Sequence, residues 1–214
     1  MQVTNNAYIK DGVIYDRVTS AIGIIDKPGL RYWHGKNSNE FCAKVLDEAG
    51  ALGTGVHNVL EKFVKDEEIA KISPVENRAL NSLQTWMKKV GASIKETERT
   101  LFDHTDRYAG TFDGRAIIEN PPIKYFPMKP ANILVDYKTS KKLRNTHILQ
   151  LSAYLHTYEC TENVKLDGAV LLRFEKDMDK KKDYHAKYFT REQLVEVFGV
   201  FLAALKLYRW NKGG

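Results

Sequence analysis

A short apolar run that ends in charged residues constrains this chain more than any other stretch. Ile133, Leu134 and Val135 are apolar and partly β-branched, which suits a buried strand, and Asp136 and Lys138 follow at its C-terminal end. Because side chains alternate along a strand, Asp136 and Lys138 are expected on one face. Such a pair can hold a divalent cation and stabilise developing negative charge. The alternative is an ordinary exposed ion pair in a turn.

A second carboxylate follows the Gly110-Thr111-Phe112 run, at Asp113. We expect Asp113 to close another short strand and to lie near Asp136. Hard cations such as Mg²⁺ and Mn²⁺ prefer oxygen ligands of this kind. Residues 93–102 alternate as a strand and carry Glu98, whose ordinary role would be that of a solvated charge.

Four patterns occur in an order that resembles the PD-(D/E)XK nuclease superfamily, and within it the RecB-type exonucleases of phage and mitochondrial genome maintenance type. They span residues 53 to 154 and are Gly53-x-x-x-His57, Glu98 ahead of a Gly-Thr-x-Asp ending in Asp113, Asp136-x-Lys138, and Gln150-x-x-x-Tyr154. The segments Val18-Thr19-Ser20 and Lys27-Pro28-Gly29-Leu30 are also similar to the start of phage-type exonucleases.

The resemblance implies Mg²⁺ or Mn²⁺ as cofactor. The metal ligands that it implies are His57, Asp113, Asp136 and the main-chain carbonyl of Tyr137. It gives catalytic roles to Lys138, which would assist the water or the transition state, to Glu98, which would serve a second metal, and to Gln150 and Tyr154, which would contact DNA or orient the lysine.

His57 falls in a helix expected over residues 39–66, either continuous or broken near residues 50–55. Gly53 and Glu61 lie one turn to either side, so the three share a face, and Glu61 is a candidate to support the site from outside. Gly53 and Gly55 would let this helix approach the sheet closely. The alternative for His57 is a structural or solvated imidazole.

A basic loop with Lys141, Lys142 and Arg144 follows the polar end of the strand expected at residues 133–135. Beside a site that cleaves phosphodiesters these residues would bind the nucleic-acid backbone, whereas their ordinary role is a solvated loop. Lys and Arg number 33 against 27 Asp and Glu, a net charge of +6 that suits either a polyanionic partner or mere solubility.

The remaining elements follow from turn and cap signals. Asp11-Gly12 predicts a hairpin within residues 7–15, and Ser73 and Glu76 predict a capped helix that Gly91 ends. Short helices are expected over residues 19–25 and from residue 30. Strands are expected over residues 164–174 and 184–189, a helix capped by Asn145 or Thr146 carries Gln150, and a last helix over residues 191–210 begins after Thr190.

These elements and the resemblance together predict an α/β protein with a mixed central β-sheet flanked by helices, a restriction-endonuclease-like core. With 214 residues and 43% hydrophobic content, we expect one nuclease domain over 1–214, its N-terminal hairpin and helices (about 1–90) packed on a catalytic core (about 91–214).

The two cysteines, Cys42 and Cys160, lack metal-site spacing and cannot supply the four ligands of the iron-sulfur cluster that some relatives carry. We therefore expect no iron-sulfur cluster. No apolar run approaches a membrane span and the N-terminus lacks a secretory pattern, so a cytoplasmic protein without a membrane partner is expected.

The predicted function is a metal-dependent DNA exonuclease that acts at single-stranded or duplex ends, favours single strands, and serves recombination, repair or replication. A recombination protein or a single-strand-binding protein is a candidate partner. The alternative is a non-catalytic nucleic-acid-binding or accessory protein that retains the fold. A helicase-linked motor is excluded for the chain itself, because it has no phosphate-binding Gly-x-x-x-x-Gly-Lys loop.

Overall fold

The computed structural model describes residues 1–4 and 7–213, which form a sheet of eight strands. The strand order is β1-β2-β3-β5-β6-β7-β8, and β4 pairs with β5 off this path. The pairs β3–β5 and β6–β7 are parallel and the others antiparallel, so the predicted mixed sheet is confirmed. The strands are β1 (Gln2–Val3), β2 (Ala7–Lys10), β3 (Val13–Arg17), β4 (Ala92–Asp103), β5 (Tyr108–Ile118), β6 (Ala131–Lys138), β7 (Gly168–Phe174) and β8 (Tyr184–Thr190).

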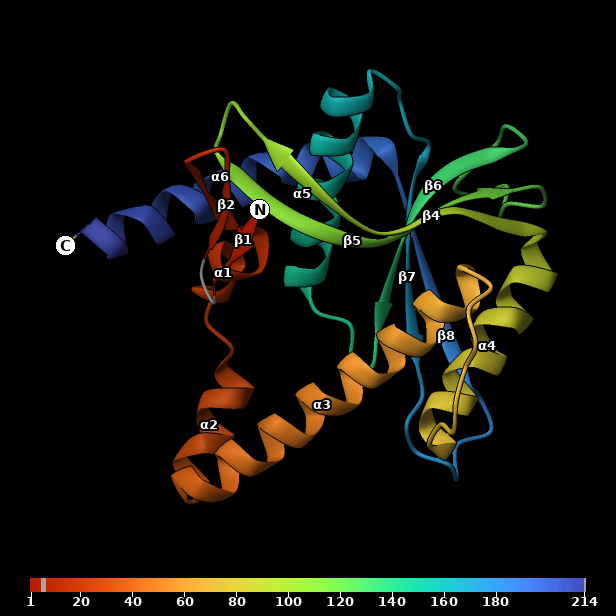
Figure 1. Ribbon diagram of the computed structural model, residues 1–214, viewed down its shortest axis with the longest axis horizontal. Helices are drawn as coiled ribbons and strands as arrows, with labels where there is room; N and C mark the ends of the chain where they lie inside the picture. The colour runs from red at the N-terminus through yellow and green to blue at the C-terminus, as the bar shows by residue number, and fades with distance from the viewer. Residues whose placement is uncertain (5–6, 214) are drawn as a thin grey trace.

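Helices cover both faces of this sheet (Figure 1). The helices are α1 (Val18–Gly23), α2 (Pro28–Lys36), α3 (Asn39–Val64), α4 (Pro74–Val90), α5 (Asn145–Glu162) and α6 (Arg191–Gly213). One core lies between the sheet and α3 and α4, where Ile133 and Val135 of β6 meet Leu60 and Leu83. A second core lies under α1, α5 and α6, where Leu134 of β6 meets Leu151. The alternation of Ile133, Leu134 and Val135 between the two cores explains why this run is apolar throughout.

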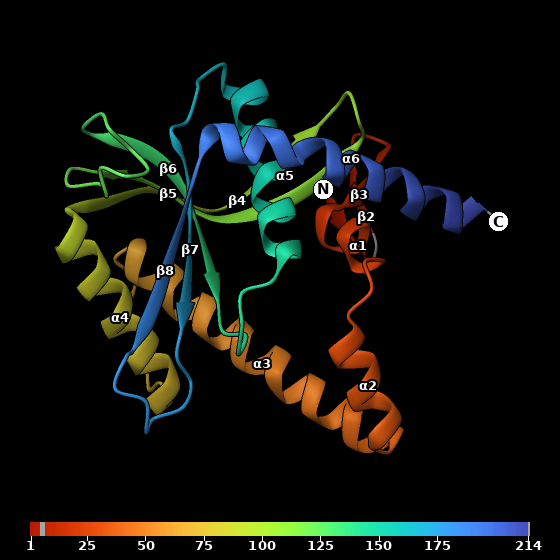
Figure 2. The same ribbon diagram turned by 180° about the vertical axis from the view of Figure 1, so that it is seen from behind.

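Part of the helical structure stands away from the sheet. Helix α2 and the N-terminal half of α3 extend from the body, and the C-terminal end of α6 also projects from it (Figure 2). None of the residues of α2 is buried. No described helix is both long enough and apolar enough to cross a membrane.

Local signals placed most elements correctly. The hairpin turns at Asp11 and Gly12, both with positive φ. Helix α4 has the predicted capping box, in which Ser73 N donates to Glu76 Oε2 (2.6 Å) and Glu76 N donates to Ser73 Oγ (3.3 Å). Gly91 ends it in the left-handed conformation.

Helix α3 is continuous through residues 50–55, which is one of the two alternatives expected. The starts of α5 and β7 differ from the expectations. Helix α5 begins at Asn145 after Arg144, not after a cap at Asn145 or Thr146, and the Arg144 amide donates to His147 Nδ1 (3.2 Å). Strand β7 begins at Gly168 and not at residue 164. The residue before it, Asp167, contacts β6 through its side chain, whose Oδ2 accepts a hydrogen bond from the Asn132 amide at 2.7 Å.

Candidate metal centre

The two aspartates of the sequence patterns lie at a fork in the sheet. Pairing between β5 and β6 runs from Ile118↔Ala131 to Gly114↔Val135, and Asp113 and Asp136 are the next residues on their strands. Beyond this point β5 continues beside β4 and reaches β3, whereas β6 continues beside β7. The strands therefore diverge where both carboxylates emerge.

This arrangement corrects the expectation that Asp113 closes a short strand. Strand β5 has 11 residues and pairs with β4 over its length, from Tyr108↔Asp103 to Ile118↔Ala92. What ends next to Asp113 is its pairing with β6. Strand β5 continues past Asp113 because β4 pairs with it there, and no local pattern around Asp113 reveals this partner.

His57 reaches this fork from α3. Its Nδ1 lies 3.5 Å from Glu98 Oε1 and 3.5 Å from Asp113 Oδ1. Ligand atoms of His57, Glu98 and Asp113 all lie within 4.8 Å of one another. Imidazole and carboxylate donors at such separations are compatible with a shared divalent cation.

Glu98 owes its position to an unusual backbone conformation. The β4–β5 register passes from Thr97↔Gly114 to Arg99↔Phe112, and Glu98 between them has φ 48°. The left-handed region is unfavourable for a glutamate, so the surrounding ladder must hold it there. Such strain concentrates at functional sites, and here it accompanies a carboxylate beside His57.

Asp136 and Lys138 form a buried ion pair on one face of β6, as predicted. Lys138 Nζ lies 2.5 Å from Asp136 Oδ2, and the Asp136 side chain is 1% exposed. The alternative of an exposed pair in a turn is therefore wrong. Asp136 is not part of the compact group of His57, Glu98 and Asp113, so this group contains Glu98 where the resemblance implied Asp136.

The carboxylate oxygens at the fork differ in how they are satisfied. Asp113 Oδ2 accepts a hydrogen bond from the Tyr137 amide at 2.5 Å, which orients Asp113. Both oxygens of Asp136 are buried; Oδ2 is paired with the Lys138 ammonium, whereas Oδ1 accepts no hydrogen bond from a residue in the described part of the chain. A buried carboxylate oxygen with unused lone pairs is costly unless a cation binds it, so Asp136 Oδ1 fits a hard metal ion.

The electrostatics of the fork are dominated by burial. Burial raises the pKa of both Asp113 and Asp136, and the positive charges of His57 and Lys138 oppose this only in part. Burial alone would lower the pKa of His57, but Asp113 and Glu98 outweigh it and raise that pKa to about 9. The pKa of Lys138 is likewise raised, because Asp136 and Asp113 outweigh its burial. Lys138 therefore stays an ammonium at neutral pH.

Gln150 and Tyr154 lie together on α5 and border the fork. Gln150 Nε2 donates to Tyr154 Oη (3.1 Å), and both side chains are buried. They line a cavity of about 230 Å³ together with Glu98, Arg17 and other polar groups. Gly110 is required here, because a Cβ at that position would lie 2.5 Å from Tyr154 Cε1.

The predicted basic loop forms one wall of a groove of about 630 Å³, whose other wall is the connection between α1 and α2. Lys141, Lys142 and Arg144 stand on the first wall and Lys27 on the second. Sequence reasoning included Lys27 only in a motif and gave it no role. Burial and the charges of Lys138, Arg144 and Lys27 lower the pKa of His147 to about 4, so this ring is neutral at pH 7.

Two expectations about α3 are corrected. Gly55 faces α4 and not the sheet, since a Cβ there would lie 2.2 Å from Glu76 Oε1. A Cβ on Gly53 would make only an ordinary contact with Thr139 Oγ1, at 3.4 Å. Glu61 pairs with Lys65 (2.6 Å) on the helix surface. Gly55 therefore does not help α3 to approach the sheet, whereas Gly53 faces Thr139, the residue that follows β6.

A scan against protein families and a search of curated proteins found no match. Among solved structures, the chain is similar to SSO0001, at 16% identity and TM-score 0.45, over 95% of this chain and 78% of that one. It is similar to a protein from Eubacterium rectale whose name gives it provisionally as an exonuclease, at 12% identity and TM-score 0.49, over 91% and 79% of the two chains. A third is LHK-Exo, an alkaline exonuclease from Laribacter hongkongensis, at 10% identity and TM-score 0.42, over 92% and 91%. Similarities this remote leave the assignment of function to the site itself.

Proposed function

We propose that this chain is a divalent-metal-dependent deoxyribonuclease that hydrolyses phosphodiester bonds. The observation that carries the proposal is the pair of buried carboxylates, Asp113 and Asp136, at a fork in the sheet, with Lys138 and His57 on either side. A purely structural ion-pair cluster would not leave the buried Asp136 Oδ1 without a hydrogen bond.

Mg²⁺ or Mn²⁺ would be held by His57, Glu98 and Asp113, whose ligand atoms lie within 4.8 Å of one another. Asp136 and the Tyr137 carbonyl, which the resemblance implies as ligands, would be available to the same ion or to a second one. When bound, the metal supplies Lewis-acid activation of water and of the phosphodiester. The chain's own contributions are separate. The Tyr137 amide fixes the orientation of Asp113, and Lys138, being protonated, stabilises negative charge on the phosphoryl oxygens and does not act as a base.

The groove beside the fork supports a nucleic-acid substrate. The groove has a basic wall on each side, with Lys27 on one and Lys141, Lys142 and Arg144 on the other. The acidic residue of the groove, Asp26, is paired with Arg31 at 3.2 Å. Phosphates of a bound strand would be neutralised there, while Gln150 and Tyr154 position the nucleotide at the scissile bond.

The further proposals concern the form of the substrate. We propose that all 214 residues act as one nuclease domain and that cleavage is exonucleolytic, with single-stranded DNA preferred. The competing function is a nucleic-acid-binding protein without catalysis. Retention of His57, Asp113, Asp136 and Lys138 together favours the enzyme.

The test is incubation of end-labelled DNA, single- and double-stranded, linear and circular, with Mg²⁺ or Mn²⁺. Linear substrates should be shortened from an end, and a chelator should stop the reaction. Asp113→Asn should lose cleavage while retaining DNA binding and thermal stability close to the wild type. Full activity of Asp113→Asn, or activity in excess chelator, would refute the metal mechanism. Efficient cutting of closed single-stranded circles would identify an endonuclease.

A further inference from the structure

A second basic groove lies at the β8 edge of the sheet, and none of its residues belongs to the fork or to the groove of Lys27. It has a volume of about 630 Å³ and is bounded by the end of α4, the connection after β5, and β8 with the connection that precedes it. Its functional groups are Lys89, Lys181, Lys182, Tyr184, Tyr188 and, at its floor, the buried Trp86.

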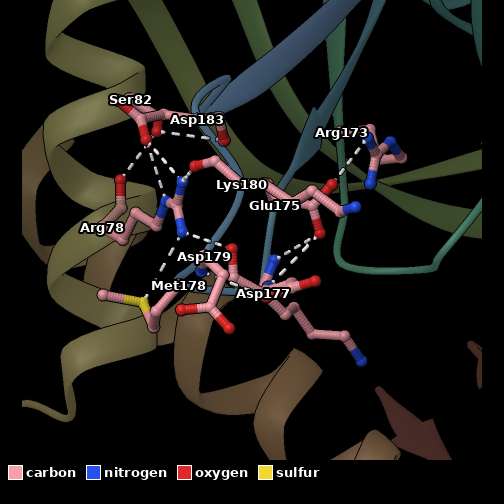
Figure 3. Close-up of polar contacts among 10 residues, drawn as sticks. Arg78, Ser82, Arg173, Glu175, Asp177, Met178, Asp179, Lys180 and Asp183 are labelled. Carbon is pink, nitrogen blue, oxygen red and sulfur yellow. Dashed lines mark hydrogen bonds and ion pairs between the residues drawn. The ribbon is translucent and has the colours of Figure 1, made fainter.

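Lys181 and Lys182 lie on a connection between β7 and β8 that the buried side chain of Arg78 holds in place (Figure 3). Arg78 of α4, only 9% exposed, donates to the main-chain oxygens of Asp177 (2.6 Å) and Lys180, and to Asp183 Oδ1 (2.9 Å). At the start of the connection, Glu175 Oε1 accepts from the Lys176 amide at 3.1 Å. Residues 175–183 are therefore anchored at several points, and little ordering is needed before the lysines can bind an anion.

The charge of the groove is uncompensated. Asp183, its acidic residue, is paired with Arg78 at 2.7 Å. Within residues 1–4 and 7–213, Lys89, Lys181 and Lys182 form no ion pair. Three unpaired ammonium groups around one concave surface favour a polyanion.

The aromatic residues give the groove a second kind of contact. Tyr184 and Tyr188 are four residues apart on β8, so they share a face, and both are partly exposed. Tyr188 is fixed by the Trp86 indole, whose Nε1 donates to Tyr188 Oη at 2.8 Å. Aromatic rings beside lysines are the combination that binds single-stranded nucleic acid, because bases stack on the rings while phosphates meet the charges.

We propose that this groove binds a segment of single-stranded nucleic acid, with phosphates on Lys89, Lys181 and Lys182 and a base stacked on Tyr184. The statement that this segment belongs to the nuclease substrate rests on the proposed function. The statement that the groove binds single-stranded nucleic acid does not. The groove is thus a second contact for the strand, separate from the catalytic fork.

The test uses the full chain and a fluorescent oligothymidylate in EDTA, which keeps cleavage out of the measurement. The slope of log affinity against log salt should become shallower by about 1.4 in Lys181→Ala/Lys182→Ala, since each phosphate contact on a single strand contributes about 0.7. The matched control is Lys165→Ala/Lys206→Ala, two exposed lysines outside the groove that remove the same charge. It should leave the slope unchanged. Equal slopes in the two double variants would overturn the proposal.

A second pair of variants tests stacking. Tyr184→Ala should weaken binding about tenfold and Tyr184→Phe should not, because stacking on an aromatic ring does not need the hydroxyl. Thermal unfolding shows whether either variant is misfolded. Equal weakening by both substitutions would contradict stacking. Since these measurements need no metal, loss of binding in the groove can be distinguished from loss of nuclease activity. Asp113→Asn reports only on nuclease activity.

Discussion

Gly110→Ala is a perturbation whose effect follows directly from the geometry beside the fork. The new Cβ would lie 2.5 Å from Tyr154 Cε1 and 3.0 Å from Tyr154 Oη, closer than real Cβ contacts allow. The Tyr154 ring is 2% exposed and packs in the core under α5, so it cannot move away freely. Overpacking of this kind costs about 1–3 kcal/mol. Replacing glycine by alanine within a strand by itself stabilises the folded state by about 0.5–1 kcal/mol.

The net expectation is a loss of about 1 kcal/mol in the free energy of unfolding, which at this chain length lowers the Tm by about 2–4 °C. Equilibrium unfolding in urea measures it. Gly199→Ala is the matched control, because nothing lies within 4 Å of a Cβ there in α6, and it should stabilise the protein by about 1 kcal/mol.

A double-mutant cycle isolates the contact between the two positions. In a Tyr154→Leu background the ring is absent, so Gly110→Ala should be neutral or stabilising, giving a favourable coupling of about 1–2 kcal/mol. Gly110→Ala alone should also reduce nuclease activity, because a displaced Tyr154 moves its hydrogen-bond partner Gln150. A Gly110→Ala protein as stable as the wild type, with no coupling to Tyr154, would refute the packing argument.

Three further predictions use other parts of the molecule. His57→Ala should weaken metal binding and reduce any preference for Mn²⁺, which calorimetric titration with both metals measures; unchanged titrations with a lowered Tm would make His57 a packing residue. Glu96→Gln should lower the free energy of unfolding by about 1 kcal/mol at pH 7 but not at low pH. Burial opposes the charged form of Glu96, but hydrogen bonds from Arg99 and Tyr158 outweigh it and lower the Glu96 pKa. The stabilisation by Glu96 is therefore present above its pKa in the unfolded chain and is lost as the pH falls through its pKa in the folded protein. Urea unfolding across pH checks this, and a constant difference would contradict it. Lys27→Ala should make the salt slope of single-strand binding shallower by about 0.7, and an unchanged slope would remove Lys27 from the substrate groove.

Much of the local structure was determined by the sequence itself, because its signals act between neighbouring residues. Ser73 and Glu76 form their capping box across one helical turn, and Asp11-Gly12 turns the hairpin within a few residues. The apolar run ending at Asp136 and Lys138 likewise gave a buried strand and a pair on one face, since alternation is a property of any strand.

Tertiary structure decided what depends on partners far away in the chain. Strand β5 passes Asp113 without ending because β4 accompanies it, and the fork exists because β5 turns toward β3 while β6 follows β7. The left-handed conformation of Glu98, which brings its carboxylate to His57 while Asp136 turns to Lys138, is imposed by that ladder and has no local signature. The same holds for both basic grooves, whose walls come from segments that meet only after folding.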